Sequence, residues 1–217
     1  MTETQPSAGP GMTPPLRLVM TLGGLGTVAG LLIVVVFAAT RPSIEAYRAA
    51  TLHAAITEVL GNPDRYDTLY VIDGAIAAAP PAGAAPSSLE AVYLGYRDGR
   101  PIGFAIYATG QGFQDTISLI FGYDAATSEL LGMKVLESKE TPGLGDKIYK
   151  DAAFVAEFSG AVAPLVGVKA GSGPGRPGEV TMITGATISS RAVIKAINSA
   201  LEHIGPMLAA YQKGQGS

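Results

Sequence analysis

The sequence contains no cysteine and no tryptophan, and it has only two histidines in 217 residues. Without cysteine the chain forms no disulfide, holds no metal through a thiolate and has no cysteine nucleophile. His53 and His203 lie far apart in the sequence, so we do not expect a histidine-based metal centre. Any redox chemistry must therefore come from a bound organic group.

Charged residues are also few: they make up 15% of the chain, and the formal net charge is −3. There is no run of lysine or arginine, and basic residues do not alternate with aromatic ones. Proteins that bind nucleic acid usually carry such a basic surface, so we expect no nucleic-acid partner. The length is enough for one good-sized core plus an additional segment.

One segment, Leu18 to Thr40, carries no charge at all. As a helix it would span about 34 Å, slightly more than the hydrocarbon core of a membrane, and Arg17 and Arg41 bracket it. We therefore expect a transmembrane helix at residues 16–40. The alternative is a cleaved signal peptide, although the apolar region of a signal peptide usually has only about 7–15 residues. Because Arg41 and Arg48 follow the segment while Arg17 precedes it, the charges do not decide its orientation.

The remaining chain divides by composition. Residues 1–15 are polar and rich in proline, glycine and threonine, which predicts a disordered N-terminal tail. Residues 41–207 are predicted to form one domain, and residues 208–217 a flexible C-terminal tail. At the start of this domain, Pro42-Ser43 is expected to begin a second helix, which Gly61–Pro63 ends. Its predicted buried face consists of Leu52, Ala55, Ile56, Val59 and Leu60.

A block of strands follows. Asp98-Gly99 is a strong hairpin signal between strands predicted at 90–97 and 101–110. Further strands are predicted at 68–73, 115–124, 129–138 and 165–170, a loop at 75–88 and a short helix at 151–160. Strands and helices come in blocks, which predicts an α+β fold with an antiparallel sheet of at least four strands and flanking helices.

The last predicted helix begins near Ser189 and ends at Gly205-Pro206, with Ser189 or Ser190 as its N-cap. Its buried face repeats at helical spacing through Val193, Ala196, Ile197, Ala200, Leu201 and Ile204. Thr187 precedes this cap, beside the small residues Gly185 and Ala186. A helix N-terminus stabilises negative charge, so Thr187 is a plausible site for a phosphate-linked group. Ordinary helix capping with spare hydroxyls is the alternative.

Two stretches resemble the FMN-binding domain family. "TGATISS" (184–190) is similar to its flavinylation motif, in which a threonine is joined by a phosphoester to FMN, and the matching residue is Thr187. "ESKETPGLGDKI" (137–148) is similar to its second signature, E-T-P-G-L-G. The Asp-Lys that follows is most similar to the G subunit of Rnf-type electron-transport complexes, and the C subunit of the sodium-translocating NADH:quinone reductase is the near relative. Where the family often has an aspartate before the motif, this chain has Thr181.

The resemblance implies an FMN site built from both motifs. From the first motif the implied cofactor-binding residues are Thr184, Gly185, Ala186, Ile188 and Ser189, and from the second Glu140, Thr141, Gly143, Leu144 and Lys147. The second motif would lie flat against the flavin ring, with Leu144 as an apolar contact and Lys147 able to neutralise a reduced flavin. Taken alone, this stretch is better explained as an ordinary proline-glycine turn that joins a strand to a helix.

The implied function is that of an electron carrier with one covalent FMN within a membrane-bound, ion-translocating ferredoxin:NAD oxidoreductase. The implied partners are the other membrane subunits and a flavin transferase that moves FMN from FAD. The implied location is the cell inner membrane, single-pass, with the FMN domain on the periplasmic side. No independent catalytic site and no metal site are expected. The alternatives are the C subunit of the quinone reductase and a membrane-anchored assembly or binding domain without cofactor.

Overall fold

The computed structural model describes residues 15–85, 88–169, 171 and 175–215. The chain divides into two compact units, Met1–Ala49 and Ala50–Ser217, which we describe in turn. Apart from Pro15, the expected disordered tail at residues 1–15 lies outside the described residues.

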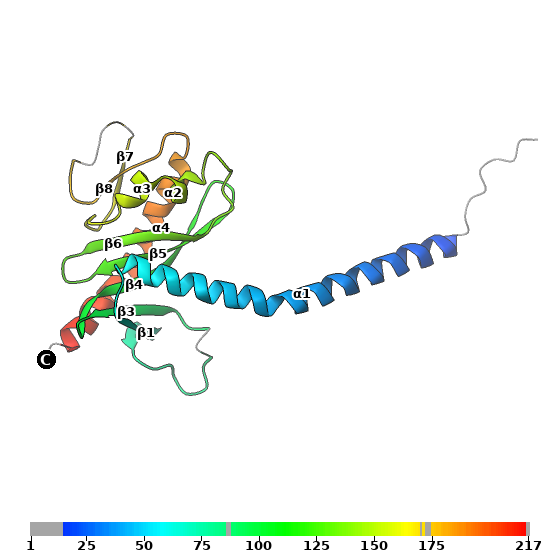
Figure 1. Ribbon diagram of the computed structural model, residues 1–217, viewed down its shortest axis with the longest axis horizontal. Coiled ribbons are helices and arrows are strands. Elements are labelled where there is room, and N and C mark those ends of the chain that lie inside the picture. The colour runs from blue at the N-terminus through cyan, green and yellow to red at the C-terminus, as the bar shows by residue number, and fades with distance from the viewer. Residues whose placement is uncertain (1–14, 86–87, 170, 172–174, 216–217) are drawn as a thin grey trace, which may run out of the picture. The chain divides into compact units, whose positions relative to one another are not determined.

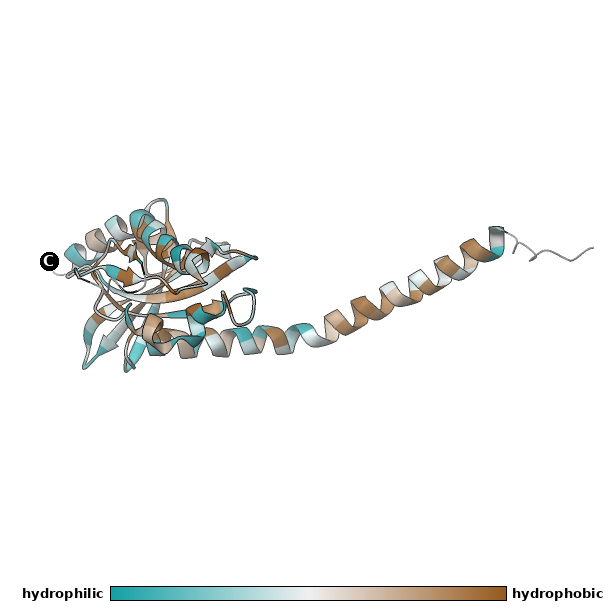
Figure 2. Cartoon of the chain, turned by 90° about the horizontal axis from the view of Figure 1, so that it is seen from above, coloured by the Kyte–Doolittle hydropathy of each residue, from teal (hydrophilic) through white to brown (hydrophobic). Residues whose placement is uncertain are grey.

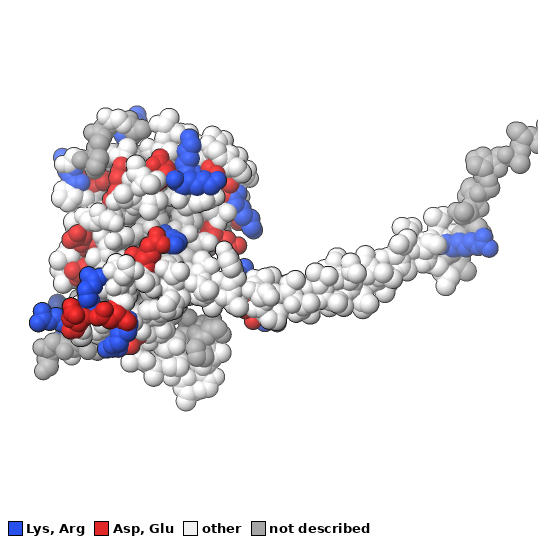
Figure 3. Space-filling model, in the orientation of Figure 1, with Lys and Arg blue, Asp and Glu red and all other residues white. Residues whose placement is uncertain are grey.

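The first unit holds most of helix α1, Pro15–Val59. Large apolar side chains from Leu18 to Phe37 are exposed along this part of the helix. Figure 2 shows the corresponding run of apolar residues, and in Figure 3 its surface is almost entirely free of charge. Within the described residues, this is the helix that is long and apolar enough to cross a membrane. A signal sequence near an N-terminus has the same properties.

Helix α1 is continuous through Pro42, so the predicted start of a separate helix at Pro42-Ser43 is wrong. A proline inside a helix removes one backbone hydrogen bond and bends the helix without having to end it. Here the Arg41–Glu45 ion pair spans the position at 2.7 Å. The boundary predicted between residues 40 and 41 therefore falls inside one helix, and the two compact units divide after Ala49.

The second unit is built on a six-stranded antiparallel sheet in the order β2-β1-β3-β4-β5-β6 (Figure 1). The strands are β1 (Arg65–Ile72), β2 (Ala75–Ala77), β3 (Ala91–Arg97), β4 (Arg100–Gln111), β5 (Thr116–Asp124) and β6 (Glu129–Glu137). The predicted α+β class, with a long apolar helix followed by an antiparallel sheet and flanking helices, is confirmed.

Two-residue turns join neighbouring strands at opposite ends of this sheet. Asp98 and Gly99 both have positive φ, at 51° and 74°, and connect β3 to β4 as the sequence predicted. Asp73 and Gly74 repeat this geometry, at 49° and 77°, between β1 and β2. The loop predicted at 75–88 is therefore wrong at its start, because Asp73-Gly74 forms a hairpin that adds β2 to the edge of the sheet.

Helices cover both faces of the sheet. Helix α4, Thr187–Gln215, packs on one face, where Val193 and Ile197 share a buried core with Phe104 and Ile106 of β4. The last turns of α1 pack on the other face against Ala105 and Ile120, and the predicted face of Ala55, Ile56, Val59 and Leu60 is buried there. Alternate residues of β4 thus serve two cores, as strand geometry requires.

Short elements connect β6 to α4. They are α2 (Lys147–Lys150), α3 (Ala152–Ala156), β7 (Val166–Val168) and β8 (Glu179–Thr181), with β7 and β8 paired in parallel. The helix predicted within 151–160 and the strand predicted within 165–170 are confirmed, and α2 was not predicted.

The predicted end of the last helix at Gly205-Pro206 is wrong. Helix α4 continues through Pro206 to Gln215 and buries Leu208 completely. Residues 208–215 of the expected flexible tail are therefore helical, because Leu208 continues the apolar face that packs on the sheet.

Candidate functional site

Three segments far apart in the sequence meet at one end of the sheet and enclose an open cavity of about 320 Å³. They are the loop between β4 and β5, the loop between β6 and α2, and the start of α4. The lining residues are Phe113, Glu140, Thr141, Leu144, Gly145, Gly185, Ala186, Thr187, Ile188 and Ser189. Small-molecule and cofactor sites typically begin at about this volume.

Helix α4 starts at Thr187, two residues earlier than predicted. Its first hydrogen bond runs from the Ser190 N–H to the Ala186 carbonyl at 2.8 Å, so Ala186 occupies the N-cap position. The predicted serine N-cap is therefore wrong. Since the amides of Thr187, Ile188 and Ser189 precede this first bond, helix geometry gives them no partner inside the helix.

A side chain in the first turn of α4, Ser190, holds the segment that precedes the helix. The Ser190 hydroxyl, fully buried, accepts from the Ile183 N–H at 3.1 Å and donates to the Ala186 carbonyl at 2.9 Å. Gly185 lies between these points with φ of +83°, a left-handed conformation that favours glycine. The Thr187 hydroxyl remains exposed, with one long hydrogen bond of 3.4 Å to the Ile183 carbonyl.

Glu140 lies in the cavity wall and is only 6% exposed. Its Oε1 accepts from the Gln114 N–H at 2.9 Å, and its Oε2 accepts from the Ser189 hydroxyl. The side chain thus joins all three segments of the cavity. Both of its oxygens accept hydrogen bonds from donors of the protein, which hold the carboxylate within the cavity wall.

Two surface contacts also tie the β4–β5 loop to the β6–α2 loop. Gln114 Nε2 donates to Thr141 Oγ1 at 3.1 Å, and Lys139 Nζ pairs with Asp115 Oδ2 at 2.8 Å. The hydrogen bond from Lys139 lowers the pKa of Asp115, and the hydrogen bond to Asp115 raises the pKa of Lys139. Exposed ion pairs of this kind contribute little to stability because water and salt screen them, so the buried Glu140 contacts are the more important connection.

The β6–α2 loop contains a second buried carboxylate, Asp146, which is 2% exposed. Its Oδ2 accepts from Lys150 Nζ at 2.6 Å. This hydrogen bond holds the pKa of Asp146 below its usual value, and the Gly143 amide acts in the same direction. The ion pair joins the glycine turn to helix α2 and fixes the loop that supplies Leu144 and Gly145 to the cavity.

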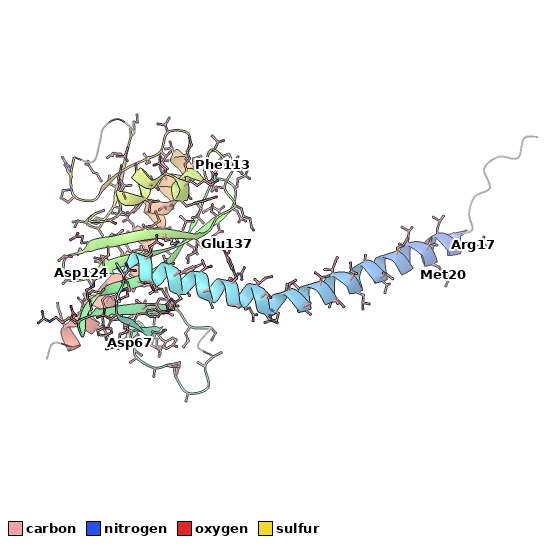
Figure 4. All side chains as sticks on the ribbon, viewed as in Figure 1. Arg17, Met20, Asp67, Phe113, Asp124 and Glu137 are labelled. Atoms are coloured by element: carbon pink, nitrogen blue, oxygen red, sulfur yellow. The ribbon has the colours of Figure 1, made fainter. Side chains whose placement is uncertain are left out.

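Three apolar side chains at the rim of the cavity are exposed: Phe113 by 66%, Leu144 by 51% and Ile188 by 52%. Figure 4 labels Phe113 at the end of the sheet where α2 and the start of α4 also lie. Each comes from a different segment of the cavity. A planar apolar ligand would cover side chains that otherwise face water.

The structure brings together eight of the predicted site residues in the cavity wall: Glu140, Thr141, Leu144, Gly185, Ala186, Thr187, Ile188 and Ser189. Thr184, Gly143 and Lys147 belong to the same segments but do not line the cavity. Phe113 and Gly145 line it and were not predicted. Gly145 lies within the second motif, which could have indicated it, whereas nothing local distinguishes Phe113. Residues 15–85, 88–169, 171 and 175–215 contain no group of three or more His, Asp or Glu arranged to hold a metal ion.

Residues 112–202 match the family model described as the FMN-binding domain. The chain is 32% identical over 168 residues to the G subunit of the ion-translocating oxidoreductase complex of Salmonella typhi, covering 74% of this chain and 77% of that protein. It is 31% identical over 180 residues to the protein of the same name from Vibrio cholerae, covering 80% and 82%. Among solved structures, Shewanella oneidensis NqrC has a TM-score of 0.61 at 16% identity, covering 76% of this chain and 99% of that one, which shows a common fold.

Proposed function

This chain belongs to the family of G subunits of ion-translocating oxidoreductase complexes, and from this premise we propose that it carries electrons through one FMN covalently attached to Thr187. As a family member it is part of such a complex and contains an FMN-binding domain. The observation that carries the proposal is that the two motifs, about 40 residues apart in sequence, form one cavity with the Thr187 hydroxyl in its wall.

The start of α4 fits the phosphate of FMN. The amides of Thr187, Ile188 and Ser189 have no partner inside the helix, and the helix dipole adds to their attraction for an anion. The phosphoester would leave the Thr187 oxygen at the position that the exposed hydroxyl now occupies. Gly185 and Ala186 leave room beside it, because neither has a side chain beyond Cβ.

The rim fits the flavin ring. Phe113, Leu144 and Ile188 present apolar side chains around the cavity, and Thr141 adds a hydroxyl. FMN supplies the redox chemistry once bound, while the protein supplies its position and electrostatic surroundings. A covalent link keeps the cofactor in place in every oxidation state, which suits a protein that passes electrons between neighbours.

Thr187 is the acceptor in the attachment reaction rather than its catalyst. Within the described residues its hydroxyl bonds to the Ile183 carbonyl, and no acidic or histidine side chain takes its proton. We therefore assign attachment to a separate flavin transferase. The Oγ1–P bond forms, the pyrophosphate bond of FAD breaks, AMP leaves, and the hydroxyl proton passes to the transferase or to water.

The apolar part of α1 is proposed to anchor the chain in the inner membrane as a single span, with the FMN domain on the periplasmic side. The partners are then the other membrane subunits of a ferredoxin:NAD oxidoreductase of the Rnf type. The identity of 31–32% to the G subunits favours this assignment over the C subunit of the quinone reductase, because the likeness to NqrC at 16% concerns the fold.

Intact mass of the full chain, produced with a flavin transferase, tests the proposal. We expect a mass increase of one FMN phosphoester in the wild type, its complete loss in Thr187→Ala, and its retention in Thr127→Ala. Thr127 is the control because it is an exposed threonine in the turn between β5 and β6, outside both motifs and the cavity lining. A wild-type chain without added mass would favour a binding or assembly domain without cofactor, and flavin retained by Thr187→Ala would remove Thr187 from the proposal.

A further inference from the structure

The wall of the cavity contains a carboxylate that the proposed attachment chemistry does not use. Glu140 lines an open cavity, yet its side chain is almost completely buried. Burying a charged group costs free energy unless hydrogen bonds compensate for the lost water. A buried acid at this position therefore needs an explanation in its contacts or in its effect on a ligand.

The contacts of Glu140 are hydrogen bonds without an ion pair. One oxygen accepts from the Gln114 N–H at 2.9 Å and the other from the Ser189 hydroxyl. None of the ion pairs found between described residues ends on Glu140. Its negative charge is held in place by neutral donors, so no ion-paired cation cancels the field that it creates in the cavity.

The backbone around Glu140 leaves no room for other side chains. A Cβ on Gly112 would collide with Oε1, and a Cβ on Gly145 would lie 2.8 Å from both Glu140 Cβ and Ser189 Oγ. Gly145 does not have a positive φ, so its backbone does not require glycine. Glycine is needed there because the loop passes directly over the Glu140–Ser189 contact.

We propose that Glu140 is a positioning residue that holds the two motif segments together through its hydrogen bond with Ser189, which we call the clasp. We also propose that the charge of Glu140 makes FMN attached at Thr187 harder to reduce. This inference rests on the proposed function. Reduction adds negative charge to a flavin, and a fixed carboxylate in the same low-dielectric wall opposes that charge. The clasp keeps the carboxylate fixed, so that it cannot turn away toward water.

Two substitutions separate the charge from the clasp. Glu140→Gln keeps the size and shape of the side chain but removes its charge, and the Ser189 hydroxyl can accept a hydrogen bond from the new amide. We therefore expect FMN to attach covalently and its midpoint potential to become more positive. Glu140→Ala removes the clasp and leaves space, so we expect a several-fold loss of attached FMN. Glu137→Gln is the matched control, because Glu137 is an exposed acid at the end of β6, labelled in Figure 4.

The measurements are intact mass of the full chain and spectroelectrochemical titration of the attached flavin. An unchanged potential in Glu140→Gln, or one equal to that of Glu137→Gln, would overturn the electrostatic part of the inference. Normal FMN attachment in Glu140→Ala would overturn the positioning part.

A further measurement remains informative even if no FMN attaches. In a Thr187→Ala background, which has no attachment site, we expect Glu140→Ala to speed amide hydrogen exchange in residues 112–115 and 141–146, and Glu137→Gln to leave it unchanged. Equal exchange in the two variants would refute the clasp by itself. A wild-type chain without flavin would refute the proposed function while leaving this result interpretable.

Discussion

Substituting Gly145 by alanine tests whether the cavity is as tightly built as the structure indicates. The added Cβ would lie 2.8 Å from Glu140 Cβ and from Ser189 Oγ, and closer still to Glu140 Oε2. Optimal carbon contacts lie at about 3.5–4.0 Å, so the loop must move by roughly 0.7 Å or more. Neither neighbour yields easily, because Glu140 is hydrogen-bonded twice and Ser189 belongs to the first turn of α4.

The expected cost follows from two opposing terms. Inserting a methyl group into a packed site typically costs about 1–3 kcal/mol. Replacing glycine by alanine at an unstrained backbone position recovers about 0.4–1 kcal/mol by restricting the unfolded chain. Taking the middle of both ranges, we expect Gly145→Ala to lower the free energy of unfolding by about 1.3 kcal/mol. We also expect it to reduce covalent FMN, because the loop moves away from the start of α4.

Gly95→Ala provides the control. Its Cβ would also come within 2.8 Å of another atom, but that atom is a terminal methyl of Leu60 that can rotate away. Urea unfolding of the flavin-free chain, followed by tyrosine fluorescence in a protein without tryptophan, measures stability, and intact mass measures FMN. If Gly145→Ala matches the wild type within about 0.5 kcal/mol and binds FMN fully, the described packing of the loop is wrong.

Three further predictions concern the scaffold that supports the cavity. Ile197→Ala should destabilise the chain by about 2–5 kcal/mol in urea unfolding, since Ile197 is fully buried between α4 and the sheet; a cost below about 1 kcal/mol would contradict that placement. Asn198→Ala should cost about 1–3 kcal/mol, because the Asn198 amide accepts from the Leu165 N–H and donates to the Leu165 carbonyl, both at 2.8 Å; Asn198→Asp should recover only the accepted bond. Asp146→Asn should reduce the loss of thermal stability on acidification. The hydrogen bond from Lys150 lowers the pKa of Asp146 in the folded protein below its ordinary 3.8. The stability that the Asp146 carboxylate contributes is therefore present above pH 3.8 and is lost as the pH falls through its pKa in the folded protein. An identical acid profile for Asp146→Asn and the wild type would show that this carboxylate is not the group that titrates.

Much of the fold follows from local patterns in the sequence. The strands at 90–97 and 101–110 were predicted correctly because Asp98-Gly99 suits the two positive φ angles of a tight hairpin. The same pair at Asp73-Gly74 did not lead to a predicted hairpin, because the residues that follow it are rich in proline and alanine. The apolar spacing of α4 predicted its buried face, but not that packing would carry the helix past Pro206.

Pro42 shows the limit of local rules for helix boundaries. A helix start was predicted there because proline favours the first turn of a helix. In the structure the helix passes through Pro42, which removes one backbone N–H from the helix without ending it. The preference of Pro42 for the first turn of a helix therefore did not set a helix boundary in α1.

The sequence by itself predicted the apolar segment from its composition, and it predicted Thr187 and the glycine turn of the second motif as site residues through their resemblance to the FMN-binding domain family. Both motifs are short and contiguous, so they can be recognised without the fold. Only the tertiary structure decided that Phe113 joins both motifs and that Glu140 binds Ser189 and the Gln114 amide inside the wall. Such contacts depend on how strands and helices 26–49 residues apart come together, and no local pattern records that distance in space.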